Sequence, residues 1–265
     1  MNYNKFRDIS CYEEFEIKSA LTGFSKVDVL KEIGHQINDY YFFISNDGIF
    51  NWFDLEGNHI EDPVVLKELK TEHIPQTISE CIIPDSVTSI GECAFYSCES
   101  LKEITIPNCV KDIGSFAFSC CESLTSITLP NNITSIGEGV FSHCESLKEI
   151  IIPDSVTHIG DYAFSYCESL QSITLPKNTT CIGNEVFCYC KSLKEIIIPD
   201  SVKSIGNGAF YSCKSLKEII IPNSVKSIGR DAFSSCDLLK EVIFKGKTSQ
   251  DIKQMRNYPF GIKFI

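Results

Sequence analysis

Apolar side chains recur along most of this chain with a period of 23 residues. Between Pro84 and Phe244 the same order of apolar and polar positions is repeated seven times, and the pattern stops at Lys245. A period of this length is typical of solenoids, in which each repeat buries its apolar side chains against the next repeat. The sequence therefore predicts a stacked array.

We number each repeat from its proline, and four further positions do not vary. Position 1 is proline in all seven repeats: Pro84, Pro107, Pro130, Pro153, Pro176, Pro199 and Pro222. Position 8 is always glycine, from Gly91 to Gly229, and position 12 is always phenylalanine, from Phe95 to Phe233. Positions 7 and 18 are always isoleucine and leucine. This register assigns every other residue of the array to a place in its repeat.

The last third of each repeat predicts a β-strand, because it is short, rich in β-branched residues and closed by the next proline. Apolar positions 18, 21 and 23 are expected to point inward; in the sixth repeat they are Leu216, Ile219 and Ile221. Side chains alternate along a strand, so positions 20 and 22 face outward. An eighth strand is expected before the first proline, where Ile78, Cys81 and Ile83 share this register. The array is therefore predicted to begin near Thr77.

The middle of each repeat predicts a second, convex wall. Its apolar residues stand at positions 4, 7, 11, 12 and 15, which is close to the spacing along one face of a short helix or turn. The glycine at position 8 interrupts any long helix. Short helices and turns both remain compatible with this pattern.

The register P-x-x-V-x-x-I-G-x-x-A-F-x-x-C-x-S-L-x-x-I-x-I resembles the BspA-type leucine-rich repeat, and residues 199–221 are a near-complete instance. Departures are conservative, such as Thr179 in place of the valine at position 4. The resemblance implies an α/β leucine-rich repeat solenoid, with a parallel sheet on the concave face and short helices or turns on the convex face. It also implies a surface role, since many members look like surface proteins of bacteria and protozoa that bind host or matrix proteins.

Residues 1–76 lack the period and are expected to form an N-terminal α+β cap or small module before the solenoid of residues 77–244. Val29, Leu30, Ile33 and Ile37 have helical spacing, which predicts an amphipathic helix over residues 28–37. A β-hairpin should follow, turning at residues 45–48, with a second turn at 55–58. Because the end of a solenoid exposes apolar surface, this segment either caps the array or serves as a separate recognition module.

Residues 245–265 follow the last repeat and are expected to form a C-terminal cap. A helix is predicted at residues 248–256, where Thr248 and Ser249 supply a start signal. Apolar side chains beyond this start are expected to fold over the last repeat.

Seven of the 14 cysteines form a ladder at position 15: Cys98, Cys121, Cys144, Cys167, Cys190, Cys213 and Cys236. Free cysteine behaves as a small buried hydrophobe, which favours core packing. Zinc needs four converging ligands, whereas a ladder places its thiols in a line. Neighbouring thiols approach disulfide distance in such a ladder, but a reducing compartment opposes that bond.

No residue pattern indicates catalysis. The five histidines stand at unrelated register positions, and the serines at position 17 recur without a paired base. A catalytic site needs a single copy of its residues and should break the repeat. We therefore expect no enzyme activity, no cofactor and no metal site.

Charge and hydropathy exclude further classes. The formal net charge is −11, which opposes binding to nucleic acid or to anionic membranes. No apolar run reaches transmembrane length, so membrane insertion is not expected. The first 20 residues have no apolar stretch behind a basic start, which predicts a cytoplasmic protein, whereas the family resemblance implies the cell surface.

The outward strand positions are the predicted partner-binding surface. Position 20 is mostly glutamate and position 22 is isoleucine or threonine, with isoleucine denser toward the C-terminal end. An exposed apolar stripe often marks an interaction site. The predicted concave-face residues are Glu149, Ile151, Glu195, Ile197, Glu218, Ile220, Glu241 and Ile243. The alternative is that both rows are simply what a soluble parallel sheet prefers.

A protein partner of unknown identity, bound by a non-catalytic scaffold, is the leading interpretation. A structural or self-assembling repeat protein is the alternative, and the expected state is a monomer or a weak homo-oligomer.

Overall fold

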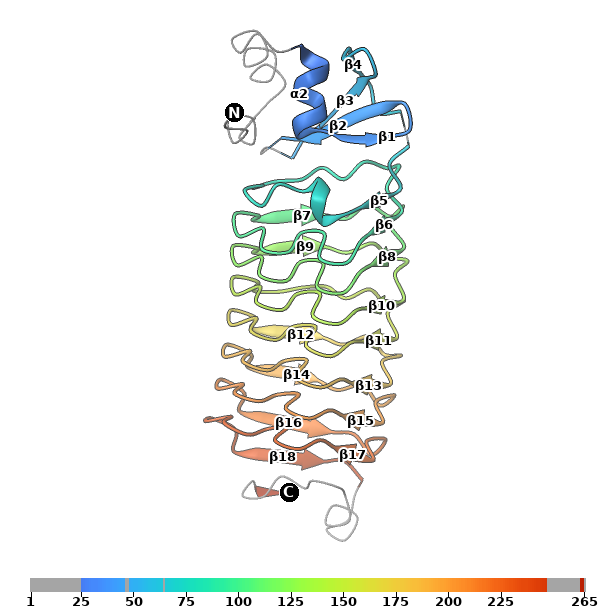
Figure 1. The fold of residues 1–265 in the computed structure, drawn as a ribbon. Coiled ribbons are helices and arrows are strands. Elements are labelled where there is room, and N and C mark those ends of the chain that lie inside the picture. Colours follow the sequence, from blue (N-terminus) through green and yellow to red (C-terminus); the bar gives the residue numbers. More distant parts are fainter. Residues whose placement is uncertain (1–24, 46–47, 64, 247–262, 265) are drawn as a thin grey trace.

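The computed structural model describes residues 25–45, 48–63, 65–246 and 263–264. A small module of one helix and four strands precedes a solenoid whose turns stack along one axis (Figure 1). The predicted repeat solenoid is therefore confirmed.

One wall of the solenoid holds the predicted strands, and we call it the long-strand wall. It contains β7 (Glu103–Thr105), β9 (Ser126–Thr128), β12 (Ser172–Thr174), β14 (Glu195–Ile197), β16 (Glu218–Ile221), β18 (Glu241–Phe244) and β19 (Lys263–Phe264). These strands pair in parallel, and residues 23 apart stand opposite each other, as Glu195 does to Ser172. Ile82 and Ile151 extend the wall through isolated bridges to Thr105 and Thr174. The repeat length is thus the pairing register of the sheet.

A second parallel wall, made of two-residue strands at positions 6 and 7, was not predicted. This short-strand wall contains β5 (Glu68–Leu69), β6 (Ser89–Ile90), β8 (Asp112–Ile113), β10 (Ser135–Ile136), β11 (His158–Ile159), β13 (Cys181–Ile182), β15 (Ser204–Ile205) and β17 (Ser227–Ile228). Figure 1 shows it on the side of the solenoid away from the longer strands. Its first strand, β5, precedes the short 3₁₀ turn η2 (Thr71–His73), so the parallel ladder reaches residues N-terminal to Thr77.

Positions 8–17 form turns, and we call this region the turn wall. No helix occurs between residues 84 and 246, so of the two predicted alternatives the turns are observed. Successive N–H groups bond alternately within the turn and to the next repeat. The Ala94 N–H donates to the Gly91 carbonyl, whereas the Phe95 N–H donates to the Ala117 carbonyl one repeat on. An α-helix needs every N–H for its own ladder, so this alternation excludes one.

Two residues of each turn have left-handed backbone. At position 10 they are Cys93, Phe116, Gly139, Tyr162, Glu185, Gly208 and Asp231, and at position 14 they are Ser97, Cys120, His143, Tyr166, Tyr189, Ser212 and Ser235. Left-handed backbone costs a residue with a Cβ about 1–2 kcal/mol. The N–H groups at both positions donate to carbonyls of the next repeat, as Tyr162 does to Asn184. Contacts between repeats therefore offset the local strain.

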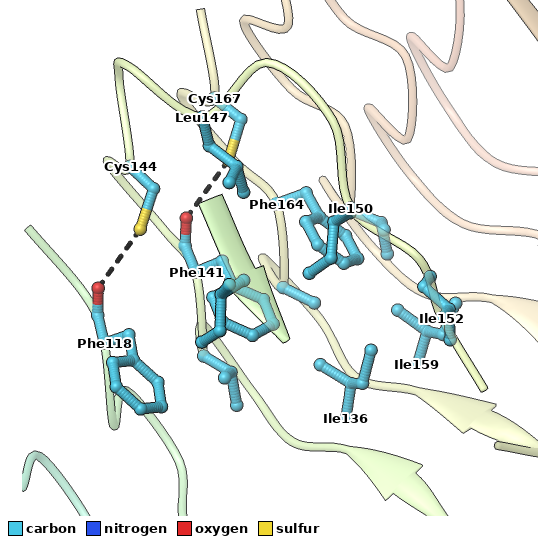
Figure 2. Packing of buried hydrophobic residues seen from close by; sticks show 14 of the residues in the cluster. Phe118, Ile136, Phe141, Cys144, Leu147, Ile150, Ile152, Ile159, Phe164 and Cys167 are labelled. Carbon is cyan, nitrogen blue, oxygen red and sulfur yellow. Dashed lines mark hydrogen bonds between the residues drawn. The ribbon is translucent and has the colours of Figure 1, made fainter. Parts of the chain in front are cut away.

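The core is a stack of identical layers. The position-12 rings from Phe95 to Phe233 stack with centroids 4.9 to 5.9 Å apart. Isoleucines from both walls, such as Ile136 and Ile150, pack beside this stack (Figure 2). Each layer therefore buries side chains against two neighbours, which a single repeat lacks.

The cysteine ladder lies in this core, as predicted. The Cys144 thiol donates to the Phe118 carbonyl at 3.2 Å, and the Cys167 thiol donates to the Phe141 carbonyl at 3.1 Å (Figure 2). Equivalent bonds join later repeats. The thiol is small enough for the layer spacing and still satisfies a carbonyl of the preceding repeat.

The position-8 glycines mark a close approach between turns. A Cβ on Gly206 would lie 2.3 Å from the Gly183 carbonyl oxygen in the preceding repeat. No side chain fits at that distance, which explains why position 8 is always glycine.

The N-terminal module contains α2 (Lys26–Ile33), β1 (His35–Ile37), β2 (Tyr40–Ile44), β3 (Phe50–Asp54) and β4 (His59–Ile60). The Ser25 hydroxyl caps α2 by accepting the Asp28 N–H. The prediction that the helix reaches Ile37 is wrong. Gly34 leaves the helical conformation, and the next three residues pair antiparallel with β2. The hairpin of β2 and β3 and the second turn before β4 are confirmed.

This module and the solenoid share one buried cluster. Phe42, Ile44 and Trp52 belong to the same core as Leu66 and Leu69 of the first turn. Continuous apolar packing therefore crosses the junction.

Two histidines also lie at this junction. The rings of His35 and His73 are 5.0 Å apart, and both contact Phe42. His73 is buried, and its Nδ1 accepts the Lys70 N–H at 3.2 Å.

At the other end, the backbone of β19 pairs in parallel with β18, matching Lys263 to Glu241. The sequence pattern does not predict this strand. The predicted helix at residues 248–256 lies outside the described residues.

Replacing Thr179 by valine is expected to stabilise the fold by about 1 kcal/mol, because its buried hydroxyl has no hydrogen-bond partner. Position 4 holds valine or isoleucine in the other six repeats, so the methyl group has a precedent. Urea unfolding of Thr179→Val measures the change. Thr180→Val, at the exposed neighbouring residue, is the control and should change stability by less than about 0.5 kcal/mol. An unchanged or lower midpoint for Thr179→Val would contradict the assignment.

Acid is expected to loosen the junction between module and solenoid. Burial lowers the pKa of His73 to about 4 and also lowers the pKa of His35, although Glu72 partly opposes both shifts. Unfolded histidine takes up its proton near pH 6.5, so the unfolded state binds more protons between about pH 6.5 and 4. Stability should therefore be full above this window and fall as the pH is lowered through it.

The measurement is the melting temperature at pH 7.5 and pH 5. His73→Asn keeps an acceptor but cannot be protonated, so it should lose a smaller part of its stability on acidification. An equal loss in both proteins would show that other groups cause the pH dependence.

Candidate functional site

The predicted concave surface corresponds to the outer side of the long-strand wall, and we call positions 20 and 22 there the strand face. Ile151 and Ile197 are 86% and 73% exposed, whereas the flanking Ile150 and Ile152 are 6% and 7% exposed. Glu149, Glu195 and Glu218 are exposed as well, and Ile220 is 39% exposed. The alternation predicted from the sequence is therefore observed.

The last pair of predicted residues is more sheltered. Glu241 and Ile243 on β18 are only half-buried, not fully exposed. β18 lies between β16 and β19, so it is not the edge of the sheet. The prediction that exposed isoleucine is densest at the C-terminal end is therefore weakened.

The strand face carries its charge and its apolar side chains in separate rows. Glu218 stands opposite Glu241, and Ile220 stands opposite Ile243, in the parallel pairing of β16 and β18. Adjacent parallel strands lie about 4.8 Å apart, so like charges in register repel each other. Position 19 places exposed lysines beside this row at Lys194, Lys217 and Lys240. A basic group from a partner would relieve the remaining repulsion.

The N-terminal end of the strand face contains a hollow of about 430 Å³ that the sequence did not predict. Ile82, at its centre, is 71% exposed. The hollow is lined by residues 80–83 and 103–105 together with Pro107, Ser126 and Thr128. The exposed apolar surface thus extends over more of this face than the predicted residues cover.

The turn wall carries an aromatic row. The rings of His143, Tyr166 and Tyr189, all at position 14, stack with centroids 4.3 and 4.5 Å apart. Tyr211, at position 13 of the next repeat, leans against Tyr189 at 5.6 Å and 58°. The sequence pattern did not predict this row.

Next to this row lies a hollow of about 600 Å³. Its lining combines carboxylate, amide, guanidinium and phenol groups from three repeats: Glu185, Cys188, Tyr189, Asn207, Gly208, Tyr211, Arg230 and Asp231. These residues occupy positions 9, 10, 13 and 14, which vary from repeat to repeat. That variation is the sequence signal for this hollow, whereas the invariant positions carry none.

The ladder thiols do not form a reactive site. All 13 cysteines among the described residues are free. Burial raises the pKa of Cys98 to about 12, and the pKa of Cys81 to about 12 with a smaller contribution from Cys98. Burial also raises the pKa of Cys121, Cys144, Cys167, Cys190 and Cys213. A thiol that stays protonated is a poor nucleophile.

Metal coordination finds no support in the described part of the chain, where no group of three histidine, cysteine or acidic side chains is placed to hold an ion. His143 stacks on Tyr166, away from any thiol pair. Within the same residues, no helix combines the length and the apolar character that a membrane crossing requires.

Comparison with known sequences places the repeats in context. The pattern of the BspA type leucine rich repeat region, in six copies, matches residues 75–194 and 157–261. A search of curated proteins finds no match.

Solved structures share the fold. A leucine rich repeat protein of T. pallidum is 32% identical with a TM-score of 0.57, covering 61% of this chain and 78% of its own. A leucine-rich repeat protein from Bacteroides ovatus is 26% identical with a TM-score of 0.39, covering 79% and 70%. A leucine rich cell surface protein from Faecalibacterium prausnitzii is 24% identical with a TM-score of 0.31, covering 80% and 88%. The last two superpose too loosely to support more than this likeness.

Cysteine labelling tests the assignment of the ladder. Native protein treated with a maleimide at pH 8 should be modified at the half-buried Cys93, Cys109, Cys120 and Cys181, while the buried ladder thiols react only on unfolding. Cys236 is half-buried and should be the first ladder thiol to react. Peptide mass spectrometry identifies each modified residue. Rapid native modification of Cys144 or Cys167 would contradict their burial.

Proposed function

Because the chain belongs to the BspA type leucine-rich repeat family, we propose that it is a non-catalytic scaffold that holds a protein partner on its strand face. Repeats of this family fit a role in protein interaction or in structure. The finer assignment, to this face and these residues, is our proposal.

One observation carries it: the fold buries its isoleucines at positions 21 and 23 but exposes those at position 22. Ile82, Ile151 and Ile197 are each more than 70% exposed. Full burial of one such side chain is worth about 1.5–3 kcal/mol. An apolar partner segment laid across the strands would recover that free energy.

The charge of the face defines the partner further. The row of glutamates at position 20 runs beside the isoleucines, and Glu195 and Glu218 are exposed. A segment with apolar side chains next to lysine or arginine complements both rows. We propose such a segment as the partner's contact region.

Both ends of the solenoid support a scaffold with closed ends. The N-terminal module packs Phe42, Ile44 and Trp52 against the first turn, and β19 pairs with the last long strand. We propose that the module of residues 26–60 caps the array. This arrangement leaves the strand face as the broadest exposed apolar surface.

Charge reversal tests the partner surface. Glu195→Lys combined with Glu218→Lys should lower capture of partners from an extract of the source organism by about tenfold, because the complementary charge is lost. Glu99→Lys, at an exposed position of the turn wall, is the matched control. Quantitative mass spectrometry after affinity capture gives the readout. Unchanged capture of every partner by the double variant would refute binding through the strand face.

Self-association is the second candidate, because an exposed isoleucine stripe on one copy can pack against that of another. Sedimentation velocity over a hundredfold range of concentration distinguishes the two roles. A mass that rises with concentration in the native chain, and stays monomeric after Ile151→Ser with Ile197→Ser, would favour self-assembly. A monomer at every concentration would exclude it.

A further inference from the structure

Position 10 of the turn wall holds two glycines that differ in what covers them. Gly139 lies under a ring, since a Cβ on Gly139 would meet Cε1 of Phe116 at 2.2 Å. A Cβ on Gly208 would meet only the flexible Cγ of Glu185 at 3.0 Å and Cβ of Tyr211 at 3.8 Å. The same notch is therefore filled by the chain's own side chain in one repeat and opens into the 600 Å³ hollow in another.

The walls of the open notch are acidic and aromatic. Glu185 and Asp231 occupy position 10 in the repeats before and after Gly208, so the two carboxyl groups flank the notch. Tyr189 and Tyr211 line it, and their rings are inclined by 58°, so they do not close against each other as the stacked pairs do. Carboxylates and aromatic rings together attract a cation.

The field around the hollow has the sign that a cation requires. Arg230 at the rim brings one positive charge against the two carboxylates, and Lys191 is already paired with Glu168 at 2.6 Å. Glu185, Asp161 and Glu138 together raise the pKa of the nearby Tyr162, with Glu185 the largest cause. Burial and Glu185 raise the pKa of Cys188 to about 12, so this thiol adds no charge.

The floor of the hollow is held in place by the ladder between repeats. The Glu185 N–H donates to the Asn207 carbonyl and the Gly208 N–H donates to the Arg230 carbonyl, both at 2.8 Å. The Asn207 side-chain oxygen accepts the Arg230 N–H at 2.8 Å. A fixed floor lowers the entropy cost of binding.

From these features we infer that the hollow over Gly208 binds the guanidinium group of an arginine side chain on a partner protein. The planar group covers the glycine as the Phe116 ring covers Gly139, its N–H groups donate to Glu185 and Asp231, and its edges contact Tyr189 and Tyr211. Guanidinium suits this lining better than ammonium, because it is flat, donates in a fork and packs on aromatic rings. This site lies on the turn wall and does not depend on binding at the strand face.

The test is an NMR titration of the full chain with a short peptide containing one arginine between glycines, beside the same peptide containing citrulline. Citrulline keeps the shape of arginine and removes its charge. The arginine peptide is expected to bind in the millimolar range, to shift the amide signal of Gly208 and to weaken with added salt. The citrulline peptide is expected to bind about tenfold more weakly.

Two variants locate the site. Glu185→Gln with Asp231→Asn should weaken arginine binding by about tenfold. Gly208→Tyr should abolish it by filling the notch, and Tyr162 shows that the left-handed backbone of position 10 accepts this side chain. Glu195→Gln on the strand face is the control and should bind as the native chain does. Circular dichroism confirms that each variant is folded.

Equal affinity for the two peptides would overturn the inference, because charge would then play no part. Unchanged arginine binding in folded Gly208→Tyr would overturn it as well, because the peptide would then occupy another surface. Neither result bears on capture of partners by the strand face, which the charge reversals at Glu195 and Glu218 test separately.

Discussion

Hydrogen bonding between each repeat and the next is the constraint on which the whole structure depends. The backbone of one turn donates to the turn 23 residues away on all three walls, so every layer must adopt the same path. This explains both the strict glycine of position 8 and the left-handed residues of the turn wall. At Gly206 the neighbouring backbone leaves no space for a Cβ, and at Tyr162 the hydrogen bond to the next repeat offsets the strain of the left-handed conformation.

The same constraint separates residues that make the layer from residues that the layer merely carries. Side chains that point inward meet their own copies above and below, so Phe141 has to fit between Phe118 and Phe164 and cannot change alone. Side chains that point outward meet solvent and can differ between repeats. Function in such a protein is therefore expected where repeats differ, and the inner positions report the fold alone.

The amino-acid pattern was sufficient to predict the solenoid because its period is also the pairing register. The spacing of prolines and the alternation at positions 20 to 23 by themselves place Ile150 and Ile152 inside and Ile151 outside, as observed. The cysteine ladder follows from the same register. The β2–β3 hairpin was predictable from a local turn signal that needs no distant partner.

Features that depend on contacts between repeats were less accessible. The two-residue strands at positions 6 and 7, such as β15, are too short to leave an alternating pattern. The turns of positions 8–17 resemble a helix in apolar spacing, and only their bonds to the next layer exclude one. Strand β19 pairs with a partner about 20 residues earlier in the chain, and Ile37 was assigned to a helix although its backbone pairs with Tyr40.

The two outer surfaces differ in how much their residues reveal. On the strand face a β-branched residue at position 22 is also what the sheet itself favours, so Thr105 or Ile197 is weak evidence for a partner taken alone. Exposure strengthens that evidence, since Ile197 is 73% exposed in a fold that buries its neighbours. The identity of the residue there still has two physical causes.

On the turn wall the backbone does not select the side chain. Position 10 has φ between 51° and 59° in every repeat, yet it carries cysteine, phenylalanine, glycine, tyrosine, glutamate and aspartate. A left-handed residue would by itself favour glycine or asparagine, so Glu185 is not explained by local conformation. Its neighbours Gly208 and Asp231 give the hollow its open floor and its second carboxylate. Because the fold requires none of these three residues in particular, a ligand is the remaining physical reason for their combination.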